Sequence, residues 1–192
     1  MMRIITGSAK GKKLVSLEGD ATRPTSERIK EAVFSSIQFD VEGRRVLDLF
    51  AGSGQMGFEA LSRGVQKATF IDLSREAMEI VKQNARITGF FDQSHFLVSD
   101  WRNYIRKASG REQFDLVFVD PPYAMKCCAD AAAYLKKSEL IIPGAIVVLE
   151  SGEEEIKMDD PRLSGYRVIK STHYGKKTFV NILFYEGAEA EI

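Results

Sequence analysis

Four aspartates in this 192-residue sequence accompany apolar runs that are typical of buried strands. They are Asp48, Asp72, Asp100 and Asp120, which lie in or at the end of the runs RRVLDLF, KATFID, SHFLVSD and FDLVFVD. A single aspartate at the end of a strand is usually a turn residue or a helix cap. Four in succession favour a binding site, because parallel strands end at one edge of a sheet and ligands bind at that edge.

A glycine-rich loop, GSGQMG (52–57), follows the first run and matches the GxGxxG pattern of dinucleotide-binding loops. Asp72 follows it at the spacing of a ribose ligand, so a nicotinamide-dependent oxidoreductase is one interpretation. Asp48 favours another, because a carboxylate beside the loop would repel a pyrophosphate. S-adenosylmethionine carries an ammonium and a sulfonium group that this carboxylate would attract, and its adenine amine could donate a hydrogen bond to Asp100.

The stretch DPPY (120–123) suits methyl transfer to an exocyclic amine of a nucleobase. Such an amine is a weak nucleophile, because its lone pair is delocalised into the ring. Asp120 and a proline carbonyl would accept its two hydrogens, while Pro121 and Pro122 fix the backbone that presents the carbonyl. Tyr123 would stack on the base, which must be unpaired or flipped out of a duplex.

The order of apolar runs along the chain predicts one α/β domain. Strands are expected at 44–50, 67–72, 94–100, 114–120 and 144–151, with a helix after each of the first four. An earlier helix should begin at a cap on Thr25 or Ser26, and two antiparallel strands should meet at a turn near Gly175. Strand–helix alternation of this kind indicates a mostly parallel sheet with helices on both faces.

Composition limits the possible classes of function. The formal net charge is zero, but residues 1–30 carry seven Lys or Arg against three acids, which is compatible with a nucleic-acid partner. The only cysteines, Cys127 and Cys128, are adjacent, so neither a disulfide framework nor a zinc site is expected. No signal peptide and no run long enough to span a bilayer is visible, so we expect a cytoplasmic protein.

These motifs together resemble a known family. VLDLFAGSG followed by DLVFVDPPY is similar to class I S-adenosylmethionine-dependent amino-methyltransferases. The stretches MRIITGSAKGKKL, TRPTSERIKEAVFSSI and HYGKKTFVNILFY resemble the bacterial family that methylates the N2 amine of one guanine in 16S ribosomal RNA. The resemblance runs from Arg3 to Tyr185. The chain departs from it at Ser35, where the family often has Asn, and at Asp72, where it often has Glu.

The resemblance implies a Rossmann-like, seven-stranded class I methyltransferase fold, with a basic N-terminal arm or hairpin over residues 1–24 and the methyltransferase domain over residues 25–192. It implies S-adenosyl-L-methionine as cofactor, S-adenosyl-L-homocysteine as product, and 16S ribosomal RNA as partner, either free or in a small-subunit assembly intermediate. A monomer with no metal and no membrane partner is expected.

The same resemblance assigns residues to three roles. The catalytic residues would be Asp120, Pro121, Pro122 and Tyr123. The cofactor-binding residues would be Asp48, Phe50, Ala51, Gly52, Gly54, Asp72, Leu73, Asp100, Trp101 and Asp120. The RNA-binding residues would be Arg3, Lys10, Lys12, Lys13, Arg23 and Arg28.

Three other functions fit parts of the pattern. Methylation of adenine N6 in DNA uses the same chemistry, but this short chain has little room for a separate target-recognition domain. A dehydrogenase would use the glycine loop and Asp72. A non-catalytic RNA-binding protein would need neither Asp120 nor Tyr123, and the basic segment near the N-terminus could equally be a solvated turn.

Overall fold

The computed structural model describes residues 2–16, 27–152, 156–157, 159–175 and 177–187. The chain divides into two compact units, Met1–Trp101 and Arg102–Ile192. The expected boundary between an N-terminal arm and a methyltransferase domain, at residues 24 and 25, lies outside the described residues. So do the expected helix caps, Thr25 and Ser26.

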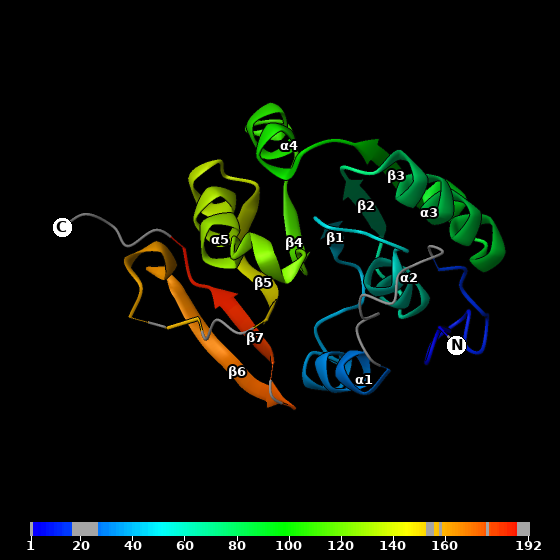
Figure 1. The fold of residues 1–192 in the computed structure, drawn as a ribbon, viewed down its shortest axis with the longest axis horizontal. Coiled ribbons are helices and arrows are strands. Elements are labelled where there is room, and N and C mark those ends of the chain that lie inside the picture. The colour runs from blue at the N-terminus through cyan, green and yellow to red at the C-terminus, as the bar shows by residue number, and fades with distance from the viewer. Residues whose placement is uncertain (1, 17–26, 153–155, 158, 176, 188–192) are drawn as a thin grey trace. The chain divides into compact units, whose positions relative to one another are not determined.

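The first unit is built on three parallel strands (Figure 1). Its elements are α1 (Glu27–Ser36), β1 (Arg45–Asp48), α2 (Gln55–Ser62), β2 (Lys67–Asp72), α3 (Arg75–Thr88), the 3-10 turn η1 (Phe91–Gln93) and β3 (Ser94–Val98). Strand β2 pairs with β1 on one side and with β3 on the other. Because the three strands run the same way, Asp48 and Asp72 end neighbouring strands at one edge, and Asp100 follows two residues after β3.

Helix α3 shows how local sequence sets the length of an element. The Ser74 side chain accepts a hydrogen bond from the Ala77 backbone at 3.2 Å, and Gly89 ends the helix in the left-handed conformation at φ 86°. Both are favoured helix-end residues. Met78 and Val81 lie on the buried face of the helix. The helix therefore begins and ends where its capping residues allow.

The N-terminal hairpin (residues 2–16) packs against helices α2 and α3 and adds to the core. Arg3 and Lys13 form an antiparallel bridge, and the Leu14 backbone donates to the carbonyl of Met2 at 2.9 Å. Ile4 and Leu14 are buried. The described part of the basic segment predicted from composition is thus a packed hairpin. These two apolar side chains are buried, and the Lys and Arg side chains of the hairpin are exposed.

A buried carboxylate on α2 holds this hairpin in place. Glu59 is fully buried, and its oxygens accept hydrogen bonds from the backbone of Ile5 at 2.8 Å and of Thr6 at 3.0 Å. The same carboxylate lies 3.6 Å from the Lys30 ammonium and 2.9 Å from the Arg63 guanidinium. Burial lowers the pKa of Lys30, and Glu59 acts against that shift by stabilising the charged form.

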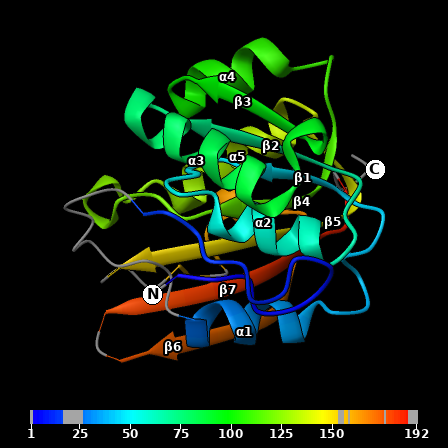
Figure 2. The same cartoon turned by 90° about the vertical axis from the view of Figure 1, so that its right-hand side faces the viewer.

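The second unit carries the antiparallel end of the fold. Its elements are α4 (Trp101–Ala108), which begins at the last residue of the first unit, β4 (Phe114–Val119), the 3-10 turn η2 (Tyr123–Met125), α5 (Cys128–Lys137), β5 (Ile141–Gly152), the 3-10 turn η3 (Pro161–Leu163), β6 (Tyr166–Tyr174) and β7 (Thr178–Tyr185). Strands β4 and β5 are parallel, whereas β7 pairs antiparallel with both β5 and β6 (Figure 2).

The predicted fold class is confirmed. The protein is α/β with seven strands, mostly parallel, and an antiparallel C-terminal pair whose turn includes Gly175. The bounds differ modestly from expectation: the first strand ends at Asp48, and β5 begins at Ile141 instead of Gly144. No helix within the described ranges is long and apolar enough to cross a membrane.

The Glu59 cluster predicts a large effect of a small substitution. Glu59→Gln keeps the size of the side chain but leaves the buried Lys30 ammonium without its counter-ion. We expect the free energy of unfolding, measured by urea denaturation, to fall by about 3 kcal/mol. Glu79→Gln, which breaks the exposed pair with Lys82, is the matched control and should change little. Equal effects of the two substitutions would contradict this account of the cluster.

Candidate active site

Asp48 ends β1 as a buried carboxylate under the first turn of α2. Its side chain is 3% exposed, and it accepts a hydrogen bond from the Gly57 backbone at 3.1 Å. Gly57 is the third residue of α2, so this bond satisfies one of the N–H groups that a helix leaves free at its N-terminus. Burial raises the pKa of Asp48 to about 7; the Gly57 bond opposes this shift and the nearby Asp72 charge adds to it.

The glycine loop turns tightly between β1 and α2. Gly52 has φ +54°, and a Cβ atom placed on it would meet nothing within 4 Å, so this part of the loop is open to a ligand. A Cβ on Gly57 would lie 2.3 Å from the Phe70 ring, so the third glycine lets the helix pack closely on β2. The backbone of Ala51 donates to the carbonyl of Ile71 at 2.8 Å, which ties the loop to β2.

Asp72 organises the backbone around the end of β2. One of its carboxylate oxygens accepts from the Gly52 backbone at 2.9 Å, and the other accepts from the Ser74 backbone at 2.8 Å. Each carboxylate oxygen has two acceptor sites, so one site on each remains for a diol. The structure therefore brings together three predicted cofactor-binding residues, Asp48, Gly52 and Asp72. Asp72 bonds to the Gly52 backbone, and its charge acts on Asp48.

The remaining predicted cofactor residues of the first unit lie in the segments that follow the strands. Leu73 is 73% exposed, so its apolar side chain is available to a flat ring. Phe50 and Trp101 have ring centroids 6.2 Å apart, and Trp101 is buried at the start of α4. Asp100 is half-buried immediately before it.

In the second unit, the DPPY stretch leaves β4 and enters the turn η2. Asp120 is half-buried and directly follows the strand, Pro121 is buried and Pro122 is exposed. The carbonyl of Pro122 accepts from the Met125 backbone at 2.8 Å, so that carbonyl already has a partner within the turn.

Sequence reasoning missed the residues that hold Tyr123. Its hydroxyl donates to the Glu150 carboxylate at 3.1 Å and lies 3.2 Å from the Thr178 hydroxyl. A Cβ atom on Gly152 would lie 2.2 Å from the Tyr123 ring, so the ring rests on that glycine. Glu150 and Thr178 are buried. Glu150 could have been found, because it is a fifth acid near the end of a strand; the hydroxyl partner on β7 had no local signal.

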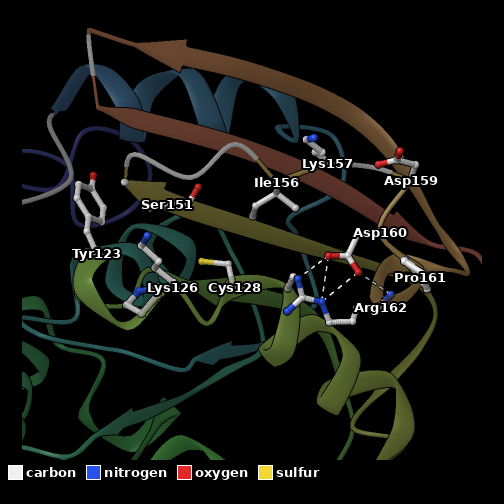
Figure 3. Close-up of a pocket in the computed structure, with 13 residues that line it drawn as sticks. Tyr123, Lys126, Cys128, Ser151, Ile156, Lys157, Asp159, Asp160, Pro161 and Arg162 are labelled. Atoms are coloured by element: carbon white, nitrogen blue, oxygen red, sulfur yellow. Dashed lines mark hydrogen bonds and ion pairs between the residues drawn. The ribbon is translucent and has the colours of Figure 1, made fainter.

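A cavity of about 490 Å³ adjoins Tyr123 in this unit (Figure 3). Ligand pockets commonly have volumes of roughly 300–1,000 Å³, so the cavity could admit a nucleobase. Its lining combines Pro121, Ala129 and Ile156 with charged side chains. Arg162 is paired with Asp160 on the cavity wall, as the dashed lines in Figure 3 mark.

The predicted RNA-binding residues differ in how they are engaged. Lys10, Lys13 and Arg28 are exposed. Arg3 forms an ion pair with Glu27 at 3.2 Å. The Lys12 ammonium donates to the carbonyl of Thr88 at 3.0 Å, at the end of α3, and so has a structural role. Arg23 lies outside the described residues.

Comparisons with known proteins agree on one group. A protein-family model described as "Conserved hypothetical protein 95" matches residues 2–183. The Bacillus subtilis protein YlbH, provisionally named an rRNA methyltransferase, is 34% identical over 154 residues, which are 80% of this chain and 84% of that protein. The ribosomal RNA small subunit methyltransferase D of Haemophilus influenzae is 31% identical over 155 residues, 80% of each chain.

A solved structure from Escherichia coli, provisionally named the methyltransferase yhhF, superposes with a TM-score of 0.81 at 25% identity. The superposition covers 97% of this chain and 98% of that one. The similarity therefore extends over both units described above.

The raised pKa of Asp48 predicts a pH-dependent effect of Asp48→Asn. The unfolded carboxyl ionises near its ordinary value of 3.8, and the folded one at about 7. The folded state thus binds more protons between these values, and the contribution of Asp48 to stability is lost as the pH rises through 7. Asn still accepts from Gly57 without titrating, so the free energy of unfolding of Asp48→Asn minus that of the parent should be about 2 kcal/mol larger at pH 8 than at pH 5.

Chemical denaturation at the two pH values measures this difference. Asp92→Asn, at an exposed position, is the control and should show no such difference. If the stability of Asp48→Asn relative to the parent were the same at pH 5 and pH 8, Asp48 would not ionise as the structure indicates.

Proposed function

Because this chain belongs to the family described as "Conserved hypothetical protein 95", which matches it over residues 2–183, we propose that it is an rRNA methyltransferase acting on a guanine N2 amine in 16S ribosomal RNA. The cofactor is S-adenosyl-L-methionine. Relatives named ribosomal RNA small subunit methyltransferase D support the choice of small-subunit rRNA. The choice of guanine N2 rests on the motif resemblance and on the chemistry of the DPPY stretch.

The observation that carries the proposal is the buried carboxylate of Asp48 beneath the glycine loop. It already accepts the Gly57 N–H at the start of α2, which is a group that a pyrophosphate would need. A second negative charge at this point would be repelled, whereas an ammonium group would be attracted. In the proposed complex, Asp48 attracts the amino-acid end of the cofactor, Asp72 accepts from the ribose hydroxyls, and Leu73 and Asp100 contact the adenine.

When bound, the cofactor supplies an electrophilic methyl group: the S–CH₃ bond breaks as the N–CH₃ bond forms, and S-adenosyl-L-homocysteine remains. Asp120 accepts a hydrogen bond from the guanine amine and so directs its lone pair toward the methyl group. The proton that the amine loses passes to Asp120 or to solvent. The contribution of these residues is chiefly positioning and electrostatics.

Tyr123 supplies a fixed stacking surface for the acceptor base. Its hydroxyl bonds to Glu150 and contacts Thr178, so the orientation of the ring is fixed before a base arrives. Stacking of a base on an aromatic ring is worth about 1–3 kcal/mol.

Transfer of a tritiated methyl group tests the proposal directly. The substrates are 16S rRNA and small subunits from a strain that lacks this protein, and the modified base is then mapped. Asp120→Ala should reduce transfer at least about 100-fold while the affinity for S-adenosyl-L-homocysteine stays near that of the parent. Asp92→Ala is the control and should keep full activity. Label on adenine would refute the guanine assignment, and full activity of Asp120→Ala would refute the role of Asp120.

The exposed lysines of the N-terminal hairpin should bind RNA phosphates through ionic contacts. Lys10→Glu with Lys13→Glu is the preferred test, because Lys12 also supports α3. The double variant should bind 16S rRNA more weakly, and the slope of log affinity against log salt should become shallower by about 1–2. Lys107→Glu with Lys137→Glu makes the same change of charge at exposed positions outside the hairpin. If both pairs had the same effect, general charge would account for RNA binding and the hairpin would have no special role.

A further inference from the structure

Asn84, on helix α3, is a fully buried polar side chain with all of its hydrogen bonds directed at backbone outside its own helix. Its amide oxygen accepts from the Val15 backbone at 2.8 Å. Its amide nitrogen donates to the carbonyl of Val15 and to the carbonyl of Ser53, both at 2.9 Å. One planar amide thus joins three parts of the first unit.

Two of these parts have separate proposed roles. Val15 belongs to the N-terminal hairpin, whose lysines are proposed to bind RNA. Ser53 is the central residue of the turn between Gly52 and Gly54, in the loop proposed to hold the cofactor. A second contact joins the same two segments, because the Ser53 hydroxyl lies 3.1 Å from the sulfur of Met2.

The geometry explains why asparagine is needed at this position. The amide must accept once and donate twice, and only Asn or Gln offers that combination on a neutral side chain. A buried carbonyl that loses its donor keeps the full cost of its desolvation. Removal of the Asn84 amide would therefore leave the Ser53 carbonyl without this donor. The peptide that follows Ser53 would keep the bond from the Gly54 N–H to the Ala51 carbonyl at 2.6 Å but would lose its tie to α3.

We propose that Asn84 is a positioning residue that fixes the glycine loop in its cofactor-binding shape and ties that loop to the N-terminal hairpin. The hairpin is then part of the framework of the cofactor site as well as a surface for RNA. This inference rests on the proposed assignment of the glycine loop to S-adenosyl-L-methionine.

Ser62 is another anchor of the hairpin, and because its side chain bonds to hairpin backbone and not to Ser53, it provides a matched control. The Ser62 hydroxyl donates to the carbonyl of Thr6 at 2.6 Å and accepts from the Ala9 backbone at 2.9 Å. Ser62→Ala should therefore loosen the hairpin without a direct effect on Ser53. Asn84→Asp keeps the acceptor for the Val15 N–H but places an acceptor against two carbonyls.

The experiment is calorimetric titration of each variant with S-adenosyl-L-homocysteine, well below its melting temperature, with no RNA present. Asn84→Asp should raise the dissociation constant for S-adenosyl-L-homocysteine about tenfold. Ser62→Ala should leave it within about twofold of the parent value. If Asn84→Asp does not fold, Asn84→Ala takes its place, because it removes the same donors without burying a charge. In methyl transfer, the KM for the donor should rise while kcat at saturation changes little.

Each result is decisive. Parent-like affinity in the Asn84 variants overturns the inference, as does an equal loss in Ser62→Ala, because the effect would then reflect general loosening of the hairpin. Failure of the parent itself to bind S-adenosyl-L-homocysteine overturns the proposed cofactor first, and this inference falls with it.

Discussion

The hydrogen bond between the Asp48 carboxylate and the Gly57 N–H is the constraint on which the proposed chemistry depends. It places a carboxylate, 3% exposed, at the helix N-terminus that a dinucleotide-binding protein would keep free for a pyrophosphate. The raised pKa of Asp48 means that the free protein holds this acid partly protonated near neutral pH. A cationic ligand would favour the ionised form, so the site is suited to an ammonium group and poorly suited to a phosphate.

Other polar groups of the first unit keep this arrangement in place. Asp72 holds the glycine loop from the end of β2, and Asn84 holds it from α3. Glu59 fixes the N-terminal hairpin on α2 through two backbone bonds and two cations. In the second unit, Glu150 accepts a hydrogen bond from the Tyr123 hydroxyl and so holds that side chain in place. In each case an acid or amide satisfies backbone or hydroxyl groups and so fixes the residues that would meet a ligand.

Sequence patterns predicted the succession of strands and helices along the chain, the acids at the strand ends and the C-terminal hairpin, because these depend on local periodicity and spacing. They could not predict the bonds of Asn84 or Glu59, since their partners lie 31–69 and 53–54 residues away in the chain. Counting charges also could not show that Lys30 is buried against Glu59 or that Lys12 bonds to Thr88. Tertiary contacts, which no local pattern records, decide which charged side chains are engaged within the protein.

The most direct measurement is a pair of calorimetric titrations of the intact protein, one with S-adenosyl-L-homocysteine and one with NADH. Both ligands offer an adenosine, but only the first has an amino-acid end with an ammonium group, and only the second has a pyrophosphate. The account predicts saturable binding of S-adenosyl-L-homocysteine at about one molecule per chain and no binding of NADH. Saturable binding of NADH, with none of S-adenosyl-L-homocysteine, would contradict it.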